Sequence, residues 1–136
     1  FSPQSDLYNL PTMQSEIVRG QEANEQYEEA VKLYNQQSYA ESREVLNTLI
    51  EKEPNVVQYQ YYAALTYLGD QKWQEGSEKL RAIAEGQSVF KDEAKYYLAI
   101  SLDKQGKTSE ALALLKSIPN RGEIGNKAQK LIEKLD

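Results

Sequence analysis

The sequence repeats itself at an interval of about 34 residues. Tyr39, Trp73 and Thr108 stand 34 and 35 residues apart, and each is followed by a similar succession of small and large apolar residues. A period of this length is typical of stacked helical pairs, in which no pair buries its apolar face alone and neighbouring pairs together form the core. The period therefore predicts an all-α solenoid that presents a binding surface, and it leaves the partner undefined.

Residue types that the chain lacks exclude several kinds of site. None of its 136 residues is cysteine, which excludes disulfides and thiolate metal sites, and none is histidine, which removes the usual general base and metal ligand. The formal net charge of −5 disfavours nucleic acid as a partner. We expect no enzymatic activity, no cofactor and no metal site.

Apolar runs in the chain are all shorter than the ~20 residues that cross a bilayer as a helix. We therefore expect no insertion of this segment into a membrane. Because the chain starts at Phe1 and not at methionine, removal of an upstream signal or membrane anchor is one interpretation.

Residues 1–20 are predicted to form an extended leader, because Pro3 and Pro11 disfavour a helix there. The apolar residues of this leader could pack back on the helices or pair with another chain, while a disordered tail or linker is the simpler interpretation. These residues are Phe1, Leu7, Tyr8, Leu10 and Met13.

Helix-forming residues dominate the remainder of the chain, which is predicted to be almost wholly helical. The periodicity and the turn residues place the helices at 24–36, 39–53, 57–68, 72–85, 90–104, 108–117 and 123–135. Ser38 and Glu41 have the spacing of a capping box at the second of these helices. The last helix has one apolar stripe and one lysine-rich face, as expected of an element that caps a solenoid.

Small residues recur where consecutive helices are expected to cross, and large apolar residues recur beside them. The small positions are Ala30, Ala64 and Ala99 in the first helices and Ser42, Gly76 and Ala111 in the second. The large positions of the second helices are Leu46, Leu80 and Leu115, followed by Leu49, Ile83 and Ile118. This pattern, over about residues 24–135, resembles the tetratricopeptide repeat, although the tryptophan position of that family is Gln26, Gln60 and Lys95 here.

The resemblance implies a right-handed α-solenoid of three helical hairpins and a C-terminal capping helix. A repeat domain over residues 21–136 would follow the leader at 1–20, with repeats at about 23–56, 57–89 and 90–120 and the cap at 122–136. The closest overall resemblance is to soluble repeat domains of bacterial membrane-tethered proteins. It implies an extracytoplasmic (periplasmic) location, with the cytoplasm as the alternative.

In the family the first helix of each pair lines a concave groove in which ligands bind. Tyr27, Tyr61 and Tyr96 recur there at the repeat interval, and we expect them to be exposed, although tyrosine also serves as a large core residue. The expected groove residues are Tyr27, Val31, Tyr34, Tyr61, Leu65, Leu68, Tyr96 and Ile100. Because these positions are aromatic and aliphatic, the mode in which some family members grip a partner's terminal carboxylate is disfavoured.

These observations predict a non-catalytic interaction module that binds a protein or peptide in the groove. The alternative is a structural spacer or self-association domain of a larger membrane-tethered protein, which would form a homo-oligomer. Two serine–lysine patterns, Ser88 to Lys91 and Ser101 to Lys104, lack the companion motifs of a serine–lysine nucleophile. Acidic residues crowd the first helix, where a solvated face is the simpler interpretation and steering of a basic partner the alternative.

Overall fold

The computed structural model of the chain describes residues 5–15 and 22–136, and within these ranges every regular element is helical. The all-α prediction is therefore confirmed. The elements are η1 (Ser5–Tyr8), α1 (Glu22–Asn35), α2 (Tyr39–Lys52), α3 (Val57–Gly69), α4 (Trp73–Ala84), α5 (Lys91–Lys104), α6 (Thr108–Lys116) and α7 (Gly122–Leu135). Each α-helix lies within two residues of its predicted bounds.

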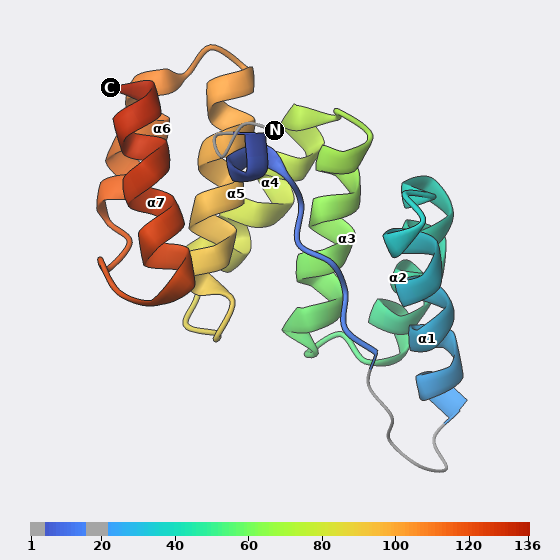
Figure 1. Ribbon diagram of the computed structural model, residues 1–136. Helices are drawn as coiled ribbons and strands as arrows, with labels where there is room; N and C mark the ends of the chain where they lie inside the picture. Colours follow the sequence, from blue (N-terminus) through green and yellow to red (C-terminus); the bar gives the residue numbers. More distant parts are fainter. Residues whose placement is uncertain (1–4, 16–21) are drawn as a thin grey trace.

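Each helix packs against the next helix along the chain, from α1 with α2 through to α6 with α7. In addition, α5 contacts both α3 and α7, so that alternate helices are neighbours on one side of the molecule (Figure 1). We call the side formed by α1, α3, α5 and α7 the inner face. Segment 5–15, drawn in dark blue, crosses it from beside α5 and α7 towards α1 (Figure 1).

The same turn joins α1 to α2, α3 to α4 and α5 to α6. In each turn one residue has a positive φ, namely Gln37 (66°), Gln71 (61°) and Gly106 (81°). The N–H group of the next residue bonds to a carbonyl oxygen five residues earlier, and this distance is 2.8 Å in all three turns. This is the Schellman arrangement, which ends one helix and lets the next begin two residues after the left-handed residue. It explains why helices begin at Tyr39, Trp73 and Thr108.

The predicted capping box at α2 is wrong. The Ser38 side chain makes no capping hydrogen bond. Ser38 belongs to the Schellman turn, where its backbone N–H bonds to the Leu33 carbonyl oxygen and its φ and ψ are −85° and 66°. The turn, and not a side-chain cap, therefore sets the start of this helix.

All six small residues at the predicted crossing positions are buried, as are the large residues beside them in the second helices. Gly76 shows how close the helices approach, because a Cβ atom there would lie 2.1 Å from Leu68 Cδ1. In α2, the buried Ser42 hydroxyl donates a 2.8 Å hydrogen bond to the Ala30 carbonyl oxygen. Small side chains thus let α1, α3 and α5 lie directly against their partners.

Among the helices of residues 5–15 and 22–136, none is both long enough and apolar enough to cross a membrane.

Candidate functional site

Residues 5–15, which we call the N-terminal segment, pack on the inner face. Leu7 and Met13 are buried, with 4% and 3% of their surface exposed. Tyr8, Leu10 and Pro11 are half-buried between them. The interpretation of the leader as a tail or linker is therefore wrong for this part, and its extended form is interrupted by the short helix η1. Phe1 and residues 16–20 of the predicted leader lie outside the described residues.

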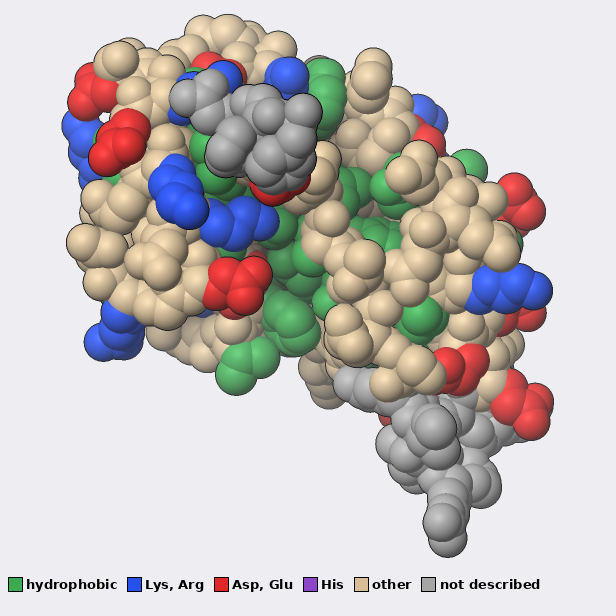
Figure 2. Space-filling model, in the orientation of Figure 1, with side chains coloured by type: hydrophobic (Ala, Val, Ile, Leu, Met, Phe, Trp, Pro, Cys, Tyr) green, Lys and Arg blue, Asp and Glu red, His purple; other side chains and the backbone are tan. Residues whose placement is uncertain are grey.

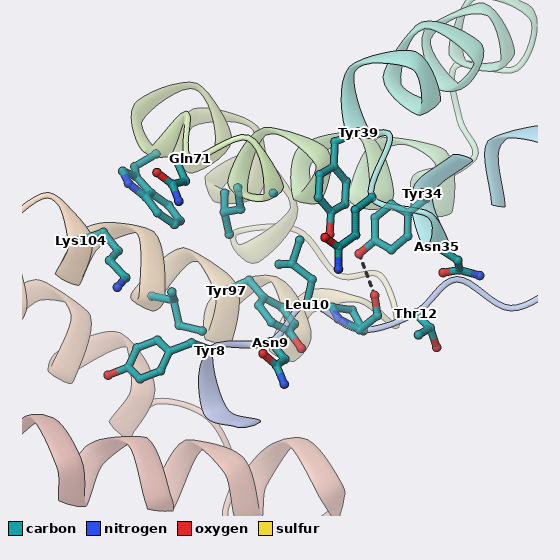
Figure 3. A pocket seen from close by; sticks show the side chains of 16 residues that line it. Tyr8, Asn9, Leu10, Thr12, Tyr34, Asn35, Tyr39, Gln71, Tyr97 and Lys104 are labelled. Carbon is teal, nitrogen blue, oxygen red and sulfur yellow. Dashed lines mark hydrogen bonds between the residues drawn. The ribbon is translucent and has the colours of Figure 1, made fainter. Parts of the chain in front are cut away.

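Two tyrosine hydroxyls hold the backbone of the N-terminal segment. The Tyr96 hydroxyl donates to the Leu7 carbonyl oxygen, and the Tyr34 hydroxyl donates to the Pro11 carbonyl oxygen, each over 2.8 Å. Tyr96 belongs to α5 and Tyr34 to α1, so the segment runs across the face in the direction opposite to the order of the helices. The Tyr34 contact is drawn in Figure 3.

Asn35, the last residue of α1, holds the far end of the segment. Its side-chain oxygen accepts a hydrogen bond from the Met13 N–H, and its side-chain NH₂ donates to the Met13 carbonyl oxygen, both at 3.0 Å. An amide side chain that satisfies both backbone groups of one residue imitates the pairing of two strands. None of these four hydrogen bonds uses a side chain of the segment, so they would hold a different extended sequence equally well.

The expected exposure of Tyr27, Tyr61 and Tyr96 is wrong, because the three are only 2%, 2% and 0% exposed. Their rings are covered by neighbouring helices and by the N-terminal segment. The Tyr27 hydroxyl accepts a 2.7 Å hydrogen bond from the Gln58 side chain. The Tyr61 ring stacks on Phe90 with 4.7 Å between ring centroids. Aromatic rings of this size are large enough to fill the space between helix pairs, and here they do so.

The eight predicted groove residues are all buried, but they divide by their relation to the segment. Those that line a pocket beside the segment or bond to it are Tyr34, Tyr61, Leu68, Tyr96 and Ile100. The others, Tyr27, Val31 and Leu65, belong to the core. Their role in binding a partner stays a prediction.

A pocket of about 570 Å³ lies between the segment, the turns at Gln37 and Gln71, and the end of α5 at Lys104 (Figure 3). Its wall combines aromatic rings, such as Tyr39 and Trp73, with amide side chains and Lys104. A second pocket, of about 380 Å³, borders the segment and is lined by residues of α3, α5 and α7. The segment therefore does not fill the inner face, and space for further contacts remains beside it.

Burial raises the pKa of the hydroxyls of Tyr34 and Tyr96 well above the ordinary tyrosine value. Burial raises the pKa of Tyr61 and Tyr97 as well. Tyr34 and Tyr96 therefore keep their protons to a higher pH than an exposed tyrosine does. Each remains a hydrogen-bond donor, which is what a backbone carbonyl of a bound segment requires.

Lysines gather where the segment begins. Lys104 Nζ and Lys134 Nζ lie 5.1 Å and 5.7 Å from the centre of the Tyr8 ring. Lys127 Nζ lies 5.2 Å from the Tyr96 ring and 5.7 Å from the Tyr97 ring. Figure 2 shows basic side chains beside the apolar strip of the inner face. Lysines are therefore concentrated at this end of the face, where the carboxylates of Glu93 and Glu123 also lie.

The serine–lysine pattern at Ser101 is part of a buried hydrogen-bonded group. The Ser101 hydroxyl is 2.6 Å from the Ser77 hydroxyl and donates to the Leu98 carbonyl oxygen over 2.8 Å. Lys104, the other member of the pattern, lies over the rings of Tyr8 and Trp73. In the part of the chain that the structure describes, no group of three or more acidic residues is arranged to hold a metal ion.

Two residues of the site escaped the sequence analysis, although one carried a signal. Asn35, Gly69 and Lys104 stand at the repeat interval of 34 and 35 residues, and all three line the larger pocket. Comparing the repeats at the last residues of the first helices, and not only at the tyrosine positions, would have pointed to Asn35. Lys127 belongs to the last helix, which has no partner helix in the repeat, so no such comparison points to it.

A comparison of the chain with protein-family models, with curated proteins and with solved structures finds no match.

Proposed function

We propose that this chain is a non-catalytic interaction module of the tetratricopeptide type, in which the inner face is the groove that binds an extended segment of a partner protein. In this proposal the seven helices form a right-handed solenoid of three hairpins with α7 as the cap. The recurrence of one turn geometry at Gln37, Gln71 and Gly106 supports it, as do the small buried residues at each crossing.

The observation that carries the proposal is that the inner face already holds a peptide segment, which is a short 3-10 helix over Ser5–Tyr8 and has no regular secondary structure over residues 9–15. Tyr34, Asn35 and Tyr96 make four hydrogen bonds to the backbone of the N-terminal segment, and Leu7 and Met13 occupy buried positions six residues apart. Backbone hydrogen bonds supply affinity that does not depend on sequence, and buried side chains supply selectivity. This combination is what a receptor for an extended peptide needs.

The N-terminal segment would compete with any partner. A ligand tethered by a short connection has an effective concentration in the millimolar range. A partner must therefore bind more tightly than the segment does, or the segment must be weakened first. Free chains would be protected from weak, unspecific ligands.

The test uses the full chain with Leu7→Ala and Met13→Ala, which we call the weakened-segment variant. A fluorescent peptide of residues 5–15 is titrated with this variant, and binding is followed by fluorescence anisotropy. We expect saturable binding with one peptide per chain, and weaker binding to the unsubstituted chain. Absence of binding to a variant with unchanged helical circular dichroism would contradict the proposal.

Matched substitutions of the face remove one or two hydrogen bonds to the segment. Tyr34→Phe retains the ring, and Asn35→Ala removes both contacts to Met13. A net loss of ~0.5–1.5 kcal/mol per hydrogen bond corresponds to a decrease in affinity of about two- to tenfold. Alanine at Tyr34 would be a poor choice, because it would leave a cavity in addition to removing the hydroxyl.

The second candidate function is self-association, and one observation favours it. Every copy of the chain carries both the inner face and a segment that fits it, so two copies could exchange their N-terminal segments. Light scattering over a range of concentrations tests this. A mass that rises to that of a dimer supports exchange, while a concentration-independent monomer contradicts it.

A further inference from the structure

We propose that the partner segment carries an acidic residue, a large aliphatic residue and an aromatic residue in succession, and that Lys104, Lys127 and Lys134 recognise it. This inference rests on the proposed function, because it takes the N-terminal segment as a stand-in for the partner. The corresponding residues of the segment are Asp6, Leu7 and Tyr8. The recognising lysines lie on α7 and at the end of α5.

The aromatic position is defined by two cations. The Tyr8 ring lies between Lys104 Nζ at 5.1 Å and Lys134 Nζ at 5.7 Å, within the range at which an ammonium group is attracted to a ring face. Tyr8 is half-buried, whereas both lysines are exposed. A ring at this place therefore gains cation–π attraction from two helices, which an aliphatic side chain would not.

The aliphatic position is defined by the group that holds its backbone. Leu7 is 4% exposed, and its carbonyl oxygen accepts the 2.8 Å hydrogen bond from Tyr96. Lys127 Nζ lies 5.2 Å from the ring of the same tyrosine and 3.4 Å from the Tyr97 hydroxyl. Lys127 thus lies beside the tyrosine that holds the Leu7 backbone, and the hydrogen bond from Tyr96 fixes where Leu7 and its two neighbours lie along the face.

The acidic position lies one residue before Leu7, whose carbonyl oxygen is held by Tyr96, the tyrosine beside Lys127. Burial lowers the pKa of Lys127, and the negative charge of Asp6 acts in the opposite direction by favouring the protonated ammonium group. Glu123, one turn earlier on α7, has the same effect, and Glu93 on α5 lines the same pocket. Glu93 and Glu123 therefore offset part of the charge of Lys127, and they oppose more than a single added acidic residue at this end of the face.

A partner protein fits these observations better than a second copy of the chain does. If two copies exchange segments, each contact is replaced by an identical one, and nothing offsets the entropy lost on association. A partner that presents the same three residue types with a better fit gains free energy by displacing the segment. We therefore assign the inner face to a partner segment of this chemistry.

The experiment measures peptide affinity for the weakened-segment variant by fluorescence anisotropy. The peptides are residues 5–15 unchanged, with Asp6→Asn, with Asp6→Lys, with Tyr8→Phe and with Tyr8→Leu. The same peptides are titrated into weakened-segment variants that also carry Lys127→Met, or Lys104→Met with Lys134→Met. Helical circular dichroism verifies the fold of each variant, and light scattering reports its mass at the concentrations used.

We expect Tyr8→Phe to bind as the unchanged peptide does and Tyr8→Leu to bind about two- to fivefold more weakly. That difference should disappear with Lys104→Met and Lys134→Met. Asp6→Asn should weaken binding about two- to fivefold and Asp6→Lys about tenfold, with smaller effects at high salt and against Lys127→Met. Such coupling between a peptide residue and a lysine is what a structural role alone would not produce.

Three results would overturn the inference, and they differ in whether they also contradict the proposed function. Equal binding of all five peptides would leave the groove as a peptide receptor and remove its selectivity for this chemistry. No binding of any peptide would remove the proposed function as well. Formation of dimers by the unsubstituted chain at the same concentrations would make a second copy, and not a partner protein, the occupant.

Discussion

The Tyr96 hydroxyl donates a 2.8 Å hydrogen bond to the carbonyl oxygen of Leu7, a residue 89 positions earlier in the chain. The contact is buried, and it ties the N-terminal segment to the third pair of helices. Because Tyr34 and Asn35 hold the other end of the segment on the first pair, the segment spans the repeats. It therefore adds to the stability of the fold while it occupies the inner face.

Substituting the two buried residues of the segment should destabilise the chain. Full burial of a side chain of this size contributes ~1.5–3 kcal/mol, so Leu7→Ala and Met13→Ala should each lower the free energy of unfolding by about 1–3 kcal/mol. The double substitution should lower the free energy of unfolding by less than the sum of the two single effects. Once one substitution has detached the segment, the other removes no further contact. Urea unfolding measures the effect. Gln14→Ala, at an exposed position, is the control and should change stability by less than ~0.5 kcal/mol.

The Met13 amide should exchange its hydrogen slowly, because it donates to Asn35. Asn35→Ala should remove this protection and lower stability by about 1–2 kcal/mol, since two hydrogen bonds are lost. Gln36→Ala alters an exposed neighbour and should leave the amide protected. If the Met13 amide exchanges at the rate of an unstructured peptide in the unsubstituted chain, the docking of the segment is contradicted.

Replacing glutamine by glycine in two of the repeated turns should raise the free energy of unfolding. Gln37 and Gln71 have φ values of 66° and 61°, a conformation that costs an L-residue ~1–2 kcal/mol. Part of this gain is offset by the greater freedom of glycine in the unfolded chain, ~0.5–1 kcal/mol. Gln37→Gly and Gln71→Gly should therefore each stabilise the chain by a few tenths to about 1 kcal/mol in chemical unfolding. Gly106→Gln should do the reverse, and a gain in stability there would contradict this account.

Gly125 should tolerate no side chain. An added Cβ atom would lie 2.5 Å from the Pro119 carbonyl oxygen and 3.2 Å from the Asn120 carbonyl carbon, and backbone atoms cannot rotate away as a side chain can. Although alanine is the better helix former by ~1 kcal/mol, Gly125→Ala should destabilise the chain by a net ~1–3 kcal/mol. Gly86→Ala, where the added Cβ atom would lie 3.4 Å from the Ile83 carbonyl oxygen, is the matched control for thermal unfolding.

Stability should fall at high pH because of the buried tyrosines. Burial raises the pKa of Tyr34, Tyr61, Tyr96 and Tyr97 above the value of about 10 that they have when unfolded. Above pH ~10 the unfolded chain therefore holds fewer protons than the native chain, and each tyrosine lowers the free energy of unfolding by ~1.4 kcal/mol per pH unit. Below that pH their contribution is complete. Urea unfolding between pH ~7 and ~11, followed by tyrosinate absorbance, measures the slope.

Lys127 contributes with the opposite sign. Burial lowers its pKa, so the cost of burying its charge is present at neutral pH and disappears as the pH rises through the lowered value. In the unsubstituted chain, the loss of this cost should raise stability slightly before the tyrosines lower it. In the Lys127→Met variant, stability should fall at high pH without that preceding rise. The four tyrosines outnumber this one half-buried lysine, and their effect dominates above pH ~10.

The helices could be predicted from the sequence because local signals and the repeat agree. Tyr39, Trp73 and Thr108 follow turns whose hydrogen bonds are local, and the small residues Ala30 and Gly76 mark crossings that the period places one by one. Each of these features depends on residues close in the chain or one repeat apart. Such features are readable from a single sequence.

The exposure of the tyrosines could not be predicted in the same way. Tyr61 recurs on the expected helix, but whether its ring faces solvent depends on Phe90 and on the N-terminal segment. The docking of that segment depends on contacts such as the one between Leu7 and Tyr96, which no period or local pattern encodes. The apolar residues of the leader indicated only that packing on the helices was one of three outcomes, beside pairing with another chain and a disordered tail or linker.

The central claim is that the inner face is a receptor for one extended peptide at a time. It is tested most directly by nuclear magnetic resonance of the isotope-labelled full chain during titration with unlabelled peptide of residues 5–15. We predict that the added peptide displaces the chain's own segment. The Met13 amide signal should then move to the chemical shift of an unstructured residue, while the signals of α1 and α5 keep the chemical shifts that they have when the segment is bound. Binding of the peptide elsewhere, with the Met13 amide signal unchanged at saturation, would contradict the account.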